Sequence, residues 1–111
     1  MATVTNLYVD QGSSYRNFIT VSNTDGTPLD LAGYTVASQM RKSYQSSVAY
    51  DFTASISNPA AGRVKIELSS AQSREIPAGK YLYDVEVTNP QGEKTRVVEG
   101  MVIITPEITK I

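Results

Sequence analysis

The sequence lacks cysteine, histidine and tryptophan altogether, in a length of 111 residues. Without cysteine the chain has no disulfide framework and no thiol chemistry. Without histidine it lacks the side chain that most often acts as a general base and as a metal ligand. A hypothesis of enzymatic activity or metal binding therefore has to rely on the carboxylate side chains.

The charged residues also lack an excess of either sign. Ten Lys and Arg residues stand against eleven Asp and Glu residues, for a net charge of −1. Nucleic acids and anionic membrane surfaces are bound by clustered Lys and Arg, so we expect neither as a partner. No apolar run approaches the roughly 20 residues of a membrane span. The opening stretch, MATVTNLYVDQGSS, has neither a basic nor an apolar region of a signal peptide, so we expect synthesis in the cytoplasm without one.

Short alternating segments separated by turn residues run along most of the chain. NTDGTP and NPQGEK are strong turn signals, and a length of 111 residues fits one domain, residues 1–111. The predicted strands are residues 3–9, 15–21, 34–41, 48–56, 63–68, 79–87 and 95–105. Their number, about seven or eight, and their spacing are typical of a sandwich. We therefore predict an all-β fold, an immunoglobulin-like antiparallel β-sandwich.

One helical turn is predicted between the strands at residues 63–68 and 79–87. Ser69 precedes SAQSREI, and Gln72 follows Ser69 by three positions, which is the pattern of a capping box. Pro77 and Gly79 end the helical segment. In the last strand, Gly100 suggests a bulge or a bend.

The strand GKYLYDVEV places aromatic and aliphatic residues on one face and Asp84 and Glu86 on the other. Two carboxylates on one face could act as an acid–base pair. Alternation alone, however, predicts a solvent-facing row that pairs with Lys94 or Arg96 across the hairpin. We favour the second interpretation and expect no catalytic residues and no metal ligands.

Tyrosine is the one unusual group, with seven of the nine aromatic residues. Tyr34, Tyr81 and Tyr83 fit the core, as do Phe18 and Ile19. The remaining tyrosines are ambiguous between half-buried sheet positions and contact residues. Tyr44 lies in the polar segment RKSYQSS and is the first candidate for a partner contact. The candidate contact residues are Arg41, Lys42, Tyr44 and Tyr50.

Three segments carry a resemblance that covers nearly the whole chain: LDLAGYTVASQMRKS, GRVKIELSSAQSREIPAGKYLYDVEV and KTRVVEGMVIITPEIT. The matching residues are Asp30, Leu31, Gly33, Val36, Gly79, Tyr81, Tyr83, Asp84, Val85, Glu99, Gly100, Val102, Ile104, Pro106, Glu107 and Thr109. With these motifs the chain resembles small immunoglobulin-like virion proteins of tailed bacteriophages, similar to the N-terminal domain of baseplate upper proteins.

The resemblance implies a non-enzymatic structural component of the virion, in a tail, baseplate, neck or capsid-surface module, made in the host cytoplasm. Its partners would be other virion proteins or further copies of itself. Apart from the resemblance, exposed strand edges have to be covered or charged, and the first strand and the final PEITKI could extend a neighbour's sheet. We expect no cofactor and no small-molecule substrate. The alternative is a carbohydrate-binding or host-surface-binding sandwich that uses exposed loop tyrosines. A small carboxylate-based hydrolase is the third and least favoured reading.

Overall fold

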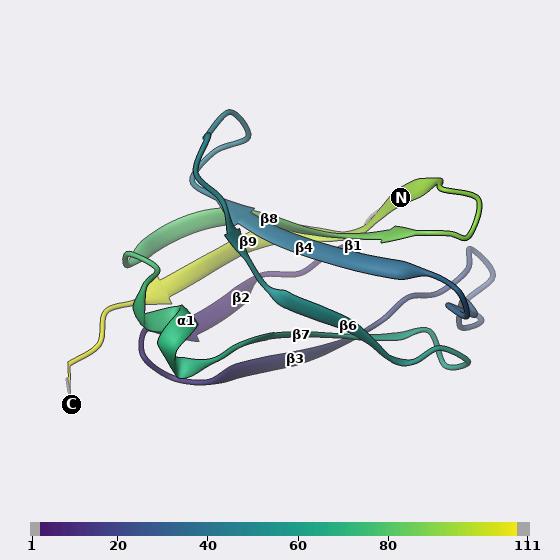
Figure 1. Ribbon diagram of the computed structural model, residues 1–111, viewed down its shortest axis with the longest axis horizontal. Helices are drawn as coiled ribbons and strands as arrows, with labels where there is room; N and C mark the ends of the chain where they lie inside the picture. The colour runs from purple at the N-terminus through teal and green to yellow at the C-terminus, as the bar shows by residue number, and fades with distance from the viewer. Residues whose placement is uncertain (1–2, 109–111) are drawn as a thin grey trace.

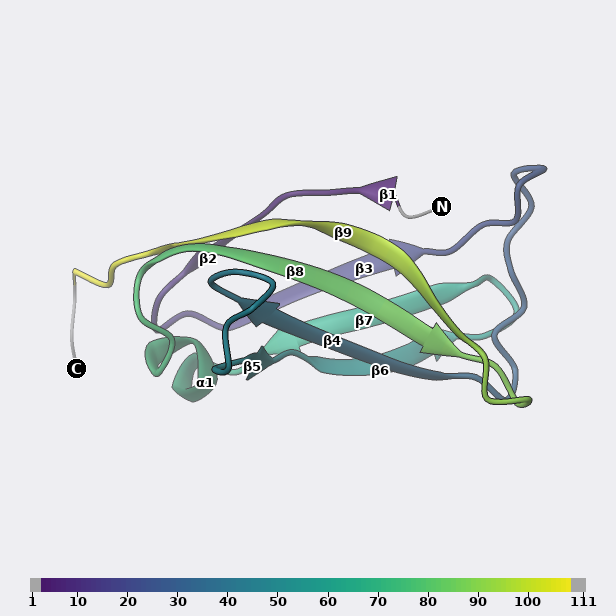
Figure 2. The same cartoon turned by 90° about the horizontal axis from the view of Figure 1, so that it is seen from above.

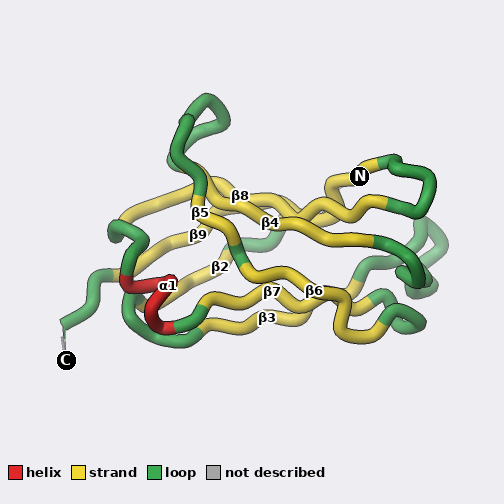
Figure 3. Tube along the Cα trace, viewed as in Figure 1, coloured by secondary structure: helices red, strands yellow, loops and turns green. Residues whose placement is uncertain are grey.

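The computed structural model describes residues 3–108 and shows two packed β-sheets with one short helix. Figures 1 and 3 show the sheets as two layers, with the helix at the end from which the C-terminal segment leaves. The strands are β1 (Thr3–Val4), β2 (Leu7–Asp10), β3 (Tyr15–Thr20), β4 (Thr35–Arg41), β5 (Tyr50–Asp51), β6 (Thr53–Asn58), β7 (Arg63–Leu68), β8 (Gly79–Thr88) and β9 (Lys94–Thr105), and α1 spans Ser70–Arg74. Thr109, within the matched motif, and the end of PEITKI lie outside the described residues.

The strand order confirms the predicted immunoglobulin-like sandwich. The large sheet has the order β1-β9-β8-β4-β5, with β2 also on β9, and the small sheet has the order β3-β7-β6. These orders correspond to the G-F-C and B-E-D strands of an immunoglobulin domain. One detail differs from the prediction, because β1 and β2 pair with β9 in parallel and make the large sheet mixed. Figure 2 shows β1 and β2 following the edge of β9.

The predicted strand at residues 48–56 is two strands in different sheets. Tyr50 of β5 pairs with Met40 in the large sheet, whereas Ala54 of β6 pairs with Ile66 in the small sheet. Phe52 lies at the crossing point and is buried. The chain therefore switches sheets at Phe52 and closes one side of the sandwich.

The core lies between the two sheets and is built by the inward faces of the alternating strands together with a few residues of the connecting segments, such as Leu31 and Ile76. Its buried apolar residues are Leu7, Val9, Ile19, Val21, Leu31, Met40, Phe52, Val64, Ile66, Leu68, Ile76, Tyr81, Tyr83, Val85, Val87, Val98, Val102 and Ile104. Tyr34 is only half-buried against this cluster. Phe18, predicted in the core, is instead 53% exposed. Its neighbour Ile19 faces inward, and successive side chains of a strand point to opposite faces.

The short helix forms as predicted and closes a tyrosine corner. Ser69 Oγ accepts from the backbone N–H of Gln72, and the Gln72 side chain accepts from the backbone N–H of Ser69. After the helix, the Tyr81 hydroxyl donates to the carbonyl oxygen of Pro77 at 2.5 Å. This return bond near the start of β8 is the arrangement found in immunoglobulin domains.

Gly100 marks a close approach of two strands, and the predicted bulge lies elsewhere. The register shift falls between Val85 and Glu86, which pair with Val98 and Arg96 and leave one extra residue on β9. A Cβ on Gly100 would lie 2.1 Å from the carbonyl oxygen of Thr5, between β1 and β2. Gly100 therefore lets the N-terminal strand pass close to β9.

Candidate functional site

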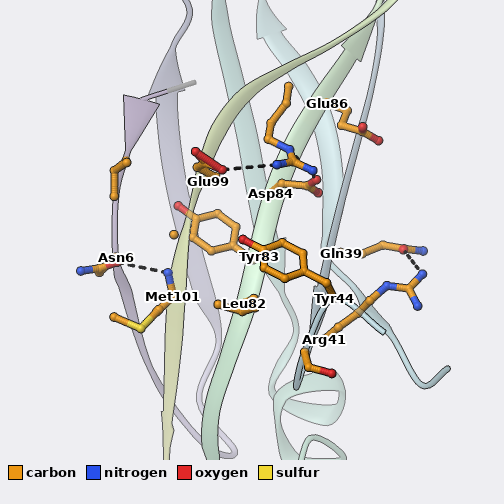
Figure 4. Close-up of a pocket in the computed structure, with 14 residues that line it drawn as sticks. Asn6, Gln39, Arg41, Tyr44, Leu82, Tyr83, Asp84, Glu86, Glu99 and Met101 are labelled. Carbon is orange, nitrogen blue, oxygen red and sulfur yellow. Dashed lines mark hydrogen bonds and ion pairs between the residues drawn. The ribbon is translucent and has the colours of Figure 1, made fainter. Parts of the chain in front are cut away.

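A hollow with a volume of about 570 Å³ lies on the outer face of the large sheet. Its floor consists of outward side chains of β8, β9 and β4. Val4 and Asn6 form one wall, and Ser43 and Tyr44 of the loop after β4 form the other. Figure 4 shows Asn6 on one side of the floor and Tyr44 on the other. The hollow is therefore framed by two segments distant in sequence.

An ionic cluster occupies one end of the hollow. Arg96 Nε lies 3.1 Å from Asp84 Oδ2, and Arg96 Nη1 lies 3.3 Å from Glu99 Oε2. Burial raises the pKa of Asp84 above its ordinary value, and the Glu86 carboxylate adds to the rise while Arg96 opposes it. The predicted cross-strand cation is therefore Arg96. Lys94 forms no ion pair with any of residues 3–108.

A second polar network fixes the opposite end. Arg41 Nη1 donates to the carbonyl oxygen of Ser46 at 2.6 Å, and Arg41 Nη2 donates to Gln39 Oε1 at 3.2 Å. Gln39 Nε2 in turn donates to Asp51 Oδ1 at 2.7 Å. The guanidinium group thus ties the loop after β4 to the floor of the hollow.

Tyr44 lies on this loop and is 77% exposed. Figure 4 shows its side chain reaching from the loop across β8, between the Asp84 cluster and Leu82. The ring therefore stands over the hollow and presents most of its surface to solvent.

The four predicted contact residues fall into two pairs. Arg41 and Tyr44 both line the hollow. Lys42 and Tyr50 instead contact Tyr81: the Lys42 ammonium lies 4.4 Å from the Tyr81 ring centroid, and the Tyr50 ring packs edge-on at 5.9 Å. The structure therefore brings only two of the four together at the hollow, and a partner contact by any of them stays a prediction.

The outer face of the large sheet also carries residues that were not among the four predicted contacts. Two cross-strand pairs of these residues are apolar. Leu82 faces Met101, and Tyr8 faces Ile103. Tyr8 is 71% exposed, and the other three are half-buried. We call these four residues the apolar rows. An apolar residue at an outward position of an alternating strand is the sequence signal that identifies them.

The described part of the chain has neither a cluster of metal-ligating side chains nor a helix that could span a membrane. Residues 3–108 hold no group of three or more Asp and Glu side chains placed to bind a metal ion. Their single short helix has neither the length nor the hydropathy of a membrane span.

Comparison with known proteins gives similarity of structure only. No family model and no curated protein matches the chain. An internalin-like protein of Listeria monocytogenes matches with a TM-score of 0.45 and 10% identity over 96% of this chain and 28% of its own. A family 123 glycoside hydrolase of Clostridium perfringens matches with a TM-score of 0.37 and 12% identity over 95% of this chain and 23% of its own. The chain thus spans less than a third of either protein, and neither likeness carries a conclusion about function.

Proposed function

We propose that the protein is a non-enzymatic structural component of a tailed-phage virion and acts through protein–protein assembly. The observation that carries the proposal is the resemblance of the three sequence segments to phage virion modules. Three of the matched residues hold structural positions in this chain. Tyr81 and Tyr83 are buried, and Gly100 lies against the carbonyl oxygen of Thr5.

The apolar rows provide the docking face in this proposal. In a half-buried sheet the outward residues are normally polar, whereas Tyr8 and Ile103 adjoin Met101 and Leu82 on the outer face of the large sheet. Contiguous apolar side chains on a protein surface are a feature of interaction sites. A neighbouring virion protein or a second copy would cover them.

Fractionation of phage particles tests the proposed function. Particles are purified on a gradient, heads and tails are separated, and an antibody to the chain is applied to each fraction. Signal that travels with intact particles supports the proposal, and the positive fraction assigns the chain to the head or the tail. Abundant protein in the soluble lysate with no signal in particles contradicts it.

A further inference from the structure

We propose that the hollow beneath Tyr44 is a binding site for an uncharged hexose oligosaccharide, which stacks on the Tyr44 ring and hydrogen-bonds to the two polar networks. This inference concerns the unassembled chain, because Leu82 and Met101 line the hollow and also belong to the apolar rows that a partner would cover. It rests on the juxtaposition of an exposed aromatic ring with two fixed polar networks and an apolar floor around one open hollow.

The size and lining of the hollow suit a small organic ligand. Its volume of about 570 Å³ falls within the roughly 300–1,000 Å³ of ligand pockets. Leu82 and Met101 supply apolar floor, while Gln39, Arg41 and Asp84 supply polar groups. A sugar ring has the matching character, because it carries hydroxyls around its edge and C–H groups on its faces.

The charges of the lining argue against an anionic ligand. The carboxylates of Asp84, Glu86 and Glu99 outnumber the guanidinium groups of Arg41 and Arg96 by three to two. Arg96 is held by Asp84 and Glu99, and Arg41 by a carbonyl and an amide oxygen. The charge of Arg96 is therefore already balanced by carboxylates. Arg41 keeps its charge, but the lining as a whole carries more negative than positive charge, which disfavours a phosphate, a sulfate or a uronate.

The polar groups are already held in place. Arg41, Gln39 and Asp51 form a continuous chain of hydrogen bonds on one side of Tyr44, and Arg96 bridges two carboxylates on the other. Side chains fixed before binding lose little entropy when a ligand arrives. Neutral hydroxyls can donate to the remaining carboxylate lone pairs, which accept several hydrogen bonds each.

Tyr44 supplies the stacking surface. A tyrosine ring offers a rigid apolar face together with a polar hydroxyl, and only two side-chain torsions are fixed on binding. In a protein core this ring would be covered, whereas here it is 77% exposed. We therefore assign to Tyr44 the contact with a C–H face of the sugar.

The test is an NMR titration of the isotopically labelled chain with neutral hexose oligomers: linear α- and β-glucans, a mannan and a galactan. We expect at least one to shift amide signals of Gln39, Arg41, Tyr44 and Leu82, with a dissociation constant of about 1 mM, or about −4 kcal/mol. Tyr44→Ala should weaken this binding about tenfold or more, and Tyr44→Phe should retain it. Tyr8→Ala is the matched control, because Tyr8 is equally exposed but lies outside the hollow.

Three results would overturn the site. They are an absence of shifts with every oligomer at concentrations well above millimolar, shifts that map to the small sheet, and binding that survives Tyr44→Ala unchanged. Each of them leaves the particle fractionation unaffected. Conversely, absence of the chain from phage particles would not change the result of the titration. Each experiment therefore tests one proposal without testing the other.

Discussion

The hydroxyl of Tyr83 donates a hydrogen bond to the backbone carbonyl oxygen of Thr5 at 2.7 Å, across Gly100 of β9. Gly100 pairs with Tyr83 on one side and approaches Thr5 on the other. The ring thus covers the position at which β9 has no side chain, and it joins β8 to the N-terminal strand. The same ring packs on Phe52 in the core, with 6.0 Å between the two ring centroids.

Truncation of this ring is the first stability test. Tyr83→Ala should lower the free energy of unfolding by about 3 kcal/mol or more, because a buried aromatic side chain leaves a cavity. Tyr83→Phe removes only the bond to Thr5 and should cost about 1 kcal/mol. Urea melts of both variants measure these losses. A loss below about 0.5 kcal/mol for Tyr83→Ala would contradict the burial of the ring.

Gly100→Ala tests the close approach of β9 and Thr5. Gly100 does not have a positive φ, so a substitution there is penalised by the contact and not by backbone strain. Since the added Cβ meets a backbone oxygen, we expect a loss of about 1–3 kcal/mol, the usual cost of overpacking. Thermal melts measure it, and NMR signals of Thr5 and Tyr83 should move. A variant as stable as the parent would show that the two strands separate freely.

The raised pKa of Asp84 predicts a pH-dependent effect on stability. Burial raises the pKa of this carboxyl above 3.8 in the folded state. Its contribution is therefore most favourable below 3.8 and is lost as pH rises through the folded value. Asp84→Asn has no carboxyl group to titrate at this position. When the pH is raised from acidic to neutral, the free energy of unfolding of the variant should therefore increase relative to that of the parent. Paired urea melts at the two pH values measure the difference.

Asp25 supplies a control of opposite sign for this experiment. Hydrogen bonds from Thr27 lower the pKa of Asp25, so its contribution is present at neutral pH and is lost on acidification. When the pH is raised from acidic to neutral, the free energy of unfolding of Asp25→Asn should therefore decrease relative to that of the parent. The same trend in both variants would contradict the assignment for Asp84.

The capping box predicts a difference between two adjacent serines. Ser69→Ala removes the acceptor for the Gln72 N–H and should destabilise the protein by about 1 kcal/mol. Ser70→Ala is the matched control, because Ser70 begins the helix and its side chain caps nothing. Denaturant melts should separate the two variants. Equal losses would assign the effect to helix propensity instead of capping.

The sequence predicted those parts of the fold that depend on local pattern. Alternation in GKYLYDVEV correctly placed Tyr81 and Tyr83 inward and Asp84 outward, since a strand has a period of two. Ser69 and Gln72 identified the helix start, because a capping box is contained in four residues. The same rule of alternation, applied to Phe18 and Ile19, would have excluded one of them from the core.

Features that depend on contacts between distant parts of the chain could not be predicted from the local sequence pattern. Residues 48–56 alternate without interruption, and the switch of sheets at Phe52 depends on the partners that β4 and β7 offer to either side. The parallel pairing of β2 with β9 joins residues more than 90 positions apart, such as Leu7 and Val102. For the site, Tyr44 and Arg41 were identified from a polar loop with one aromatic residue. Asn6 lies between β1 and β2, and Met101 lies on β9, and no local signal encodes that these two segments are adjacent.

The most direct test of assembly through the outer face of the large sheet compares Tyr8→Lys with Phe18→Lys. Both residues are exposed aromatics, but Tyr8 belongs to the apolar rows and Phe18 lies on β3 of the small sheet. Each variant, shown by a urea melt to be folded, is supplied during infection in place of the parent chain, and its amount in purified particles is measured. We predict that Tyr8→Lys is depleted from particles while Phe18→Lys is incorporated like the parent. Full incorporation of Tyr8→Lys would contradict docking through the apolar rows.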